Sequence, residues 1–216
     1  MSGDDTLQRA VERQERALAE TRRAFGDEHP RSLTTMLDLA EALWAQGRLI
    51  AARRLEEQVV AGRRTLLGDE HPDTLKAIGK LAVTMAAQGD LDEARRLQEG
   101  IVAAMRARGG EAATDTLRAI NNLAGTLAAQ GELADACELL HSVISTMADE
   151  YGEQHPDSLT AMGNLASILW QGGDRAEAYE LQRQVVELRR RANGADDPST
   201  LTAAAALEMM ERDAAF

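Results

Sequence analysis

The sequence predicts an all-α protein, a solenoid of antiparallel helix pairs with about ten helices. Its strongest signal is an internal repeat of 42 residues that runs through nearly the whole chain without insertion or deletion. Its composition agrees, because aromatic residues make up only 3% of the chain and the apolar residues are mostly small or aliphatic, which suits helix–helix packing. The repeated positions include Gly26, Gly68, Gly110, Gly152 and Gly194, and Leu33, Leu75, Leu117, Leu159 and Leu201.

The first helix of each pair, helix A, is clearest in the second repeat. Pro72 stands where a first helical turn tolerates a missing N–H, and Asp73 places a negative charge near the positive end of the helix dipole. Gly89 is a typical residue to end such a helix. Between these ends, one apolar stripe recurs at helical spacing. It consists of Leu75, Ile78, Leu81, Ala82 and Met85.

The second helix of each pair, helix B, follows directly. Asp90 and Glu93 resemble a capping box at its start. Small residues at Ala82 and Ala94 would let helices A and B approach closely. The apolar stripe of helix B is Ala94, Leu97 and Ile101. Because one pair cannot bury its own apolar face, neighbouring pairs must supply the rest of the core.

The repeat divides the chain into four complete pairs and a half repeat at each end. The leading half resembles a helix B and the trailing half a helix A, and both are predicted to cap the array. The predicted boundaries are 1–24 for the first half repeat, 25–66, 67–108, 109–150 and 151–192 for the complete repeats, and 193–216 for the last half repeat.

The loop that opens each repeat carries a family resemblance. The phrase Leu67-Gly-Asp-Glu-His-Pro-Asp-Thr-Leu75, followed by Ala87-Gln88-Gly89, resembles the 42-residue tetratricopeptide repeats of kinesin light chains. The resemblance covers residues 25–201 and implies a right-handed superhelix. In the third repeat Ala113-Thr114 replaces His-Pro, so a looser entry to its helix A is expected.

Several features predict a cytoplasmic, bacterial protein. The single cysteine, Cys137, rules out an internal disulfide and fits a reducing compartment. The first residues lack the character of a signal peptide, and no apolar run approaches the length of about 20 residues that spans a bilayer. Arginine outnumbers lysine 22 to 2, a bias typical of GC-rich bacterial genomes.

The net charge of −12 is uneven along the chain. Residues 1–108 carry 17 basic and 18 acidic side chains, whereas residues 109–216 carry 7 basic and 18 acidic ones. A nucleic-acid partner needs a basic footprint, which the second half lacks. The sequence therefore predicts neither nucleic-acid nor membrane binding.

No pattern of residues predicts catalysis, a cofactor or a metal site. His29, His71 and His155 occupy equivalent positions, but equivalent points in successive repeats lie roughly 16–20 Å apart. Ligands of one zinc ion must each lie about 2 Å from it, so these histidines are assigned to capping and loop packing before proline. Cys137 lacks a companion His and Asp pattern and is interpreted as structural.

The resemblance implies a partner-binding groove lined by the A helices. In this groove, basic residues would pair with acidic groups of the partner, and asparagine amides would hydrogen-bond the backbone of an extended peptide. Tryptophans would contact an apolar anchor residue of the partner. The alternatives are a solvated face for the lysines, inter-helix hydrogen bonds for the asparagines and core or inter-repeat packing for the tryptophans. The predicted groove residues are Trp44, Lys76, Lys80, Arg118, Asn121, Asn122, Asn164, Ser167 and Trp170.

The leading functional hypothesis is a non-catalytic adaptor that binds a peptide or partner helix with acidic and apolar residues. The alternatives are a scaffold that self-associates through its terminal half repeats, and a regulatory subunit of an enzyme or signalling complex. For the last helix, the expected inward residues are Leu201, Ala204, Leu207 and Met210, which would leave Ala205, Met209 and Phe216 as an apolar surface for a second chain.

Overall fold

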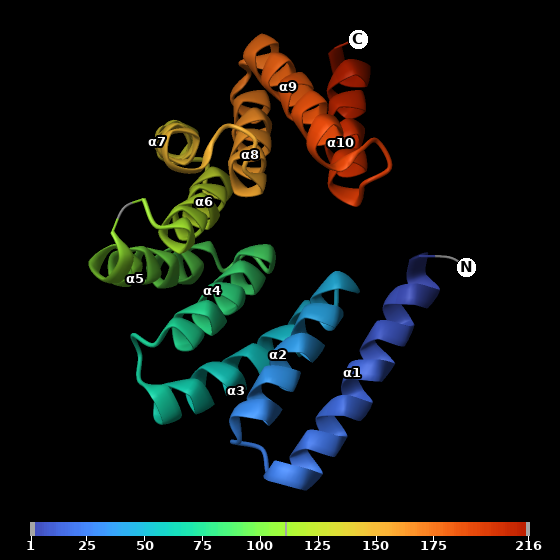
Figure 1. Ribbon diagram of the computed structural model, residues 1–216, viewed down its shortest axis with the longest axis vertical. Helices are drawn as coiled ribbons and strands as arrows, with labels where there is room; N and C mark the ends of the chain where they lie inside the picture. The colour runs from blue at the N-terminus through green and yellow to red at the C-terminus, as the bar shows by residue number, and fades with distance from the viewer. Residues whose placement is uncertain (1–2, 111, 215–216) are drawn as a thin grey trace. The chain divides into compact units, whose positions relative to one another are not determined.

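The computed structural model describes residues 3–110 and 112–214. Within these residues it contains ten α-helices and no strand, which confirms the predicted fold class (Figure 1). The first five are α1 (Gly3–Phe25), α2 (Pro30–Ala45), α3 (Leu49–Leu67), α4 (Pro72–Ala87) and α5 (Leu91–Gly109). The others are α6 (Thr114–Ala129), α7 (Leu133–Tyr151), α8 (Pro156–Gly172), α9 (Arg175–Asn193) and α10 (Pro198–Ala214).

The helices form two compact units, Met1–Ala104 and Met105–Phe216, which divide within α5. In the first unit, α1 packs on α2, α2 on α3, and α3 on α4. The second unit repeats this arrangement from α6 to α10, and α6 also contacts α8. Each helix therefore buries its apolar stripe mainly against its neighbours in sequence, as expected for a helical-repeat protein.

The His-Pro motif starts the A helices by capping them. His71 adopts an extended backbone conformation before Pro72, and its Nδ1 accepts a hydrogen bond of 3.1 Å from the N–H of Asp73. His29 and His155 do the same at α2 and α8, with distances of 3.2 and 3.3 Å. The predicted capping role of these histidines is thus confirmed. Ala113 has the same backbone conformation before α6 but offers no side-chain acceptor.

Glycine ends the A helices, and the starts of α3, α7 and α9 have no capping hydrogen bond from a side chain. Gly173 follows α8 in the left-handed region, with φ of 95°, where a side chain would be strained. Before α5, the Asp90 carboxylate binds Arg53 on α3, and the Asp90–Glu93 capping box stays a prediction. At the equivalent position before α9, Asp174 makes no capping hydrogen bond through its side chain. In the second repeat, the Asp90 carboxylate thus joins neighbouring repeats.

Small residues set the spacing of the helices in the first unit. Ala40 and Ala52 are fully buried on α2 and α3, as are Ala82 and Ala94 on α4 and α5. Leu33 of α2 lies directly over Gly62 of α3, where an added Cβ would come within 2.8 Å of the leucine side chain. The predicted close approach of helices A and B is therefore present, and it depends on these small side chains.

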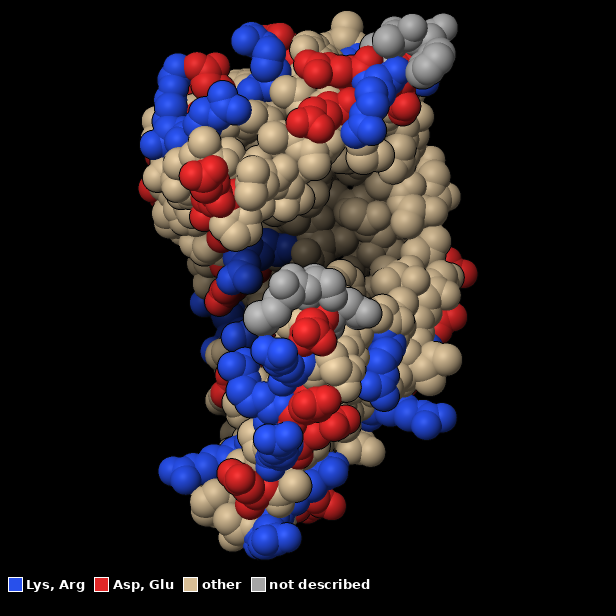
Figure 2. Space-filling view, turned by 90° about the vertical axis from the view of Figure 1, so that its right-hand side faces the viewer, with Lys and Arg blue, Asp and Glu red and all other residues tan. Residues whose placement is uncertain are grey.

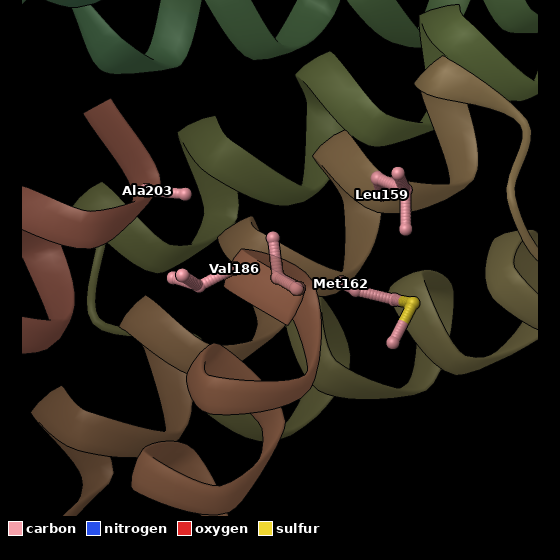
Figure 3. Packing of buried hydrophobic residues seen from close by; sticks show 5 residues of the cluster. Leu159, Met162, Val186 and Ala203 are labelled. Atoms are coloured by element: carbon pink, nitrogen blue, oxygen red, sulfur yellow. The ribbon is translucent and has the colours of Figure 1, made fainter. Parts of the chain in front are cut away.

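The second unit has a core formed by α8, α9 and α10 (Figure 3). Its buried residues are Leu159, Met162, Val185, Val186 and Ala203. On α10, however, Leu201 is 54% exposed, contrary to the expectation that it would pack inward. Its counterparts Leu33 and Leu159 are buried because each has its own helix B to pack against. No such helix follows α10 among the described residues.

Each helix A has one buried serine or threonine near its start, a feature that was not predicted from the sequence. Ser32 donates a hydrogen bond of 2.7 Å to the carbonyl of Gly26, and Thr116 one of 2.9 Å to that of Gly110. These bonds hold the glycine of the preceding loop against the helix. The 42-residue spacing of these residues could have revealed them. They are Ser32, Thr74, Thr116, Ser158 and Thr200.

Candidate partner-binding surfaces

The predicted groove residues of the first unit lie on α2 and α4. We call Asp38, Glu41, Trp44, Lys76 and Lys80 the α2/α4 surface. The Lys80 ammonium lies 2.9 Å from a carboxylate oxygen of Glu41, and this ion pair joins the two helices on their outward side. Asp38 and Lys76 are exposed on the same helices. Two basic and two acidic groups balance there, so this surface has no excess of positive charge.

Trp44 is the large apolar group of the α2/α4 surface. It is 43% exposed on the last turn of α2, one turn beyond Glu41. Trp44 is therefore not a buried core residue, while its packing between repeats stays a prediction. Exposed aromatic side chains are enriched at protein interfaces, where tryptophan often anchors the partner, whereas charged groups such as the Glu41–Lys80 pair are more common at the rim.

The predicted residues of the second unit lie on α6 and α8. We call Arg118, Asn121, Asn122, Asn164 and Ser167 the α6/α8 surface. The side-chain N–H of Asn164 donates a hydrogen bond of 3.1 Å to the amide oxygen of Asn121, so these two amides link neighbouring A helices. Asn122 and Ser167 are exposed beside them. Asparagine amides therefore both join the repeats and present polar groups to solvent.

Acidic neighbours offset the charge of Arg118. Its guanidinium lies 3.9 Å from the carboxylate of Asp115 on the same helix and 4.0 Å from that of Asp157 on α8. The hydroxyl of Ser167 donates to the carbonyl of Gly163, within its own helix. The predicted positive cluster of Lys76, Lys80 and Arg118 spans both units and remains a prediction.

Trp170 differs from its counterpart Trp44. Its ring is half-buried, and the guanidinium of Arg175 lies 5.0 Å from the ring centroid, in the range of a cation–π contact. Both residues flank the turn from α8 to α9. Trp170 therefore has a structural partner, whereas the larger exposed area belongs to Trp44.

Elsewhere, the charged side chains of both signs are interspersed. Many pair along one helix, as Arg53 does with Glu57 and Arg183 with Glu180. On the face shown in Figure 2, blue and red side chains alternate and no large patch of one sign appears. Exposed pairs of this kind contribute little to stability, because water and salt screen the attraction between the charges.

The structure shows no arrangement typical of a catalytic nucleophile at Cys137. This cysteine is half-buried on α7, and burial raises the pKa of its thiol, as do the carboxylates of Asp174 and Glu177. A thiol that keeps its proton is a poor nucleophile. Among the described residues, no group of three or more His, Cys, Asp or Glu side chains could hold a metal ion. None of the described helices is long and apolar enough to cross a membrane.

These features are typical of an all-α repeat protein whose A helices expose polar and aromatic side chains. Models of the tetratricopeptide repeat match residues 5–31, 32–73 and 74–107, and another tetratricopeptide repeat model matches residues 115–191. The chain therefore belongs to the tetratricopeptide repeat family. Repeats of this family generally mediate protein–protein interactions, and its members are typically non-catalytic.

Solved structures add detail to this assignment. The nearly identical tetratricopeptide-like repeats described as a kinesin light chain of Podosopora anserina are 33% identical to this chain, with a TM-score of 0.66, and the match covers 87% of this chain and 89% of that one. A variant of these repeats gives 33% identity and a TM-score of 0.69, over 86% and 88% of the two chains. The resemblance to kinesin light chain repeats is thus confirmed.

A third structure shares the fold at lower identity. BtubC (BKLC) from P. vanneervenii is 19% identical, with a TM-score of 0.73, and the match covers 97% of this chain and 84% of that chain. A comparison with curated protein sequences finds no match.

Proposed function

We propose that this protein is a non-catalytic adaptor that binds an extended peptide or a partner helix on the exposed faces of its A helices. The observation that carries the proposal is the α2/α4 surface, where exposed Trp44 lies one turn beyond the Glu41–Lys80 ion pair. Such a surface supplies an apolar contact and charged groups that select a partner. Membership of the tetratricopeptide repeat family supports the same conclusion.

The α6/α8 surface supports binding of an extended backbone. An asparagine amide has one oxygen and two N–H groups, and the Asn121–Asn164 hydrogen bond uses only one group of each side chain. Asn122 adds a further exposed amide. A peptide with apolar and acidic side chains would use Trp44 and the basic residues Lys76 and Lys80. Ordering such a peptide is costly, so an affinity near 1 μM, about −8 kcal/mol, is expected.

The test begins with partners that co-purify with the full chain, identified by mass spectrometry. A confirmed partner is then titrated against Trp44→Ala and Lys76→Glu/Lys80→Glu, with Arg54→Glu on the exposed side of α3 as the matched charge control. Loss of an aromatic anchor commonly costs about 2 kcal/mol, so Trp44→Ala should weaken binding about 30-fold. Unchanged binding by both variants would place the partner elsewhere.

Self-association is the second candidate function, and one observation favours it. On α10, Leu201 is 54% exposed and Met209 is 61% exposed, two helical turns apart on one face, with Ala205 between them. Phe216, which was expected to extend this surface, lies outside the described residues. Size-exclusion chromatography with light scattering separates the two functions, because a monomer at high micromolar concentration leaves only the adaptor.

A further inference from the structure

One carboxyl group is buried between the first and second repeats. Glu56 of α3 is only 3% exposed, although glutamate is among the residues that are least often buried. One of its oxygens accepts a hydrogen bond of 3.0 Å from the hydroxyl of Thr84 on α4. The other oxygen, Oε2, is buried and has no hydrogen-bond partner. A charged carboxylate is therefore poorly satisfied at this site.

The equivalent positions of helix B in the other complete repeats carry neutral side chains. They are Gln98, Leu140 and Gln182, all of them buried. Gln182 shows what a neutral polar group does there: its side-chain N–H donates a hydrogen bond of 2.7 Å to the carbonyl of Ala203 on α10. The residue of α4 that corresponds to Ala203 is Ala77. A protonated Glu56 could make the same kind of bond, whereas an ionised one has no proton to donate.

We propose that Glu56 makes the packing of α3 on α4 sensitive to pH. This contact is stable while the Glu56 carboxyl holds its proton and is weakened when the carboxyl is ionised. Thr84 and Lys80 lie one turn apart on α4, and Lys80 forms the ion pair with Glu41 of α2. A weaker contact between α3 and α4 therefore loosens the packing of α4, the helix that carries Lys76 and Lys80 of the α2/α4 surface.

The charges around Glu56 fix the direction of the effect. Burial raises the pKa of the Glu56 carboxyl; the Thr84 hydrogen bond and the Lys80 ammonium oppose this, and the neighbouring Glu57 of the same helix adds to it. Glu41 of α2 offsets part of the charge of Lys80. The folded state then holds the proton more tightly than the unfolded chain. The stability that this proton contributes is complete below the ordinary pKa of glutamate and is lost as pH rises through the raised pKa.

The experiment compares the full wild-type chain with Glu56→Gln, which introduces the amide found at Gln98 and Gln182. The control is Glu15→Gln, an exposed site on α1. Melting temperatures are measured by circular dichroism from pH 4 to 8. Relative to the wild type, Glu56→Gln should gain about 2–4 °C or more between these limits, and Glu15→Gln controls for the loss of one exposed carboxylate. A difference for Glu56→Gln that does not change with pH would overturn the proposal.

A second measurement keeps the proposal testable if Glu56→Gln does not fold. Carboxyl carbon resonances of the wild-type glutamates, assigned through the backbone, are followed by NMR over the same pH range. The Glu56 resonance should titrate at a higher pH in the folded chain than in the same chain unfolded in denaturant. If the two titrate together, the buried carboxyl does not retain its proton and the contact between α3 and α4 is not sensitive to pH.

Discussion

The amide groups of Asn121 and Asn164 are joined by a hydrogen bond of 3.1 Å between two A helices of the second unit. The two residues are not at equivalent repeat positions, since the counterpart of Asn164 is Asn122. The bond therefore runs diagonally from one repeat to the next. It gives these asparagines a structural role in addition to the binding role proposed for them.

This relationship predicts a measurable coupling. Asn121→Ala and Asn164→Ala should each lower the free energy of unfolding, and the double variant should lose less than the sum of the two. The expected coupling is about 0.5–1 kcal/mol, the usual net contribution of one hydrogen bond. Denaturant unfolding measures it. Asn122→Ala serves as the control, and its effect should be additive with that of Asn164→Ala.

The capping histidines predict a specific pattern of stability. His71→Ala removes the acceptor for the N–H of Asp73 and should cost about 0.5–2 kcal/mol. His71→Asn should retain most of the stability, because asparagine is a good capping residue. Chemical denaturation of the three proteins tests this. Equal losses for alanine and asparagine would mean that the histidine acts through packing and not as a cap.

The third repeat offers the reverse experiment. Ala113 has φ of −62° and ψ of 133° before α6, the backbone conformation of a capping residue, but lacks the acceptor. Ala113→Ser supplies one and should stabilise the chain by about 0.5–1 kcal/mol. Ala112→Ser, one residue earlier, should give no such gain. The measurement is the midpoint of denaturant unfolding, and a loss at Ala113 would show that the loop does not accommodate the hydroxyl.

The fold could be predicted because each helix depends on local signals that the repeat displays several times. Proline, histidine and glycine mark the helix ends, and the apolar stripe marks the buried face. The exposure of Leu201 could not be read from this pattern, because the residue matches its buried counterparts in sequence. The difference is that no helix B follows α10 among the described residues. Likewise, the sequence does not show that Asp90 pairs with Arg53 of the preceding repeat, because only the packing of the helices brings these two residues together.

The candidate site was harder to predict than the fold. The resemblance gave the residues of the A helices, and Trp44 and Asn122 are indeed exposed. Sequence spacing did not reveal which charges neutralise one another, so the pairing of Lys80 with Glu41 emerged only from the structure. Buried Glu56 was also missed, although its neutral counterparts in the other repeats were a visible signal.

The exposed side of α10 predicts a variant that self-associates more strongly than the wild type. Glu208 and Glu211 are exposed where α8 carries buried Ala166 and Leu169. Glu208→Ala/Glu211→Leu restores the internal pattern and leaves a larger apolar surface uncovered. Light scattering at increasing concentration should show association. Glu138→Leu on the exposed side of α7 is the control and should associate less.

The Glu41–Lys80 ion pair allows stability and binding to be separated. Because both groups are partly exposed, Lys80→Glu alone should cost at most about 1 kcal/mol of stability, mainly through repulsion of Glu41. Exchanging the charges, Glu41→Lys/Lys80→Glu, should restore that loss, which denaturant unfolding can measure. A partner that contacts Lys80 directly should still bind the exchanged protein weakly, because the positive charge now lies on α2.

The salt dependence of binding completes this prediction. Charges across a partly hydrated surface are screened, with a Debye length of about 8 Å at physiological ionic strength. Wild-type affinity for an acidic partner should fall as salt rises, and the affinity of the exchanged protein should fall less. If the exchange restores both stability and binding, Lys80 serves only to hold α4 against α2. In that case Trp44 and Lys76 would be the groups of this surface that a partner contacts.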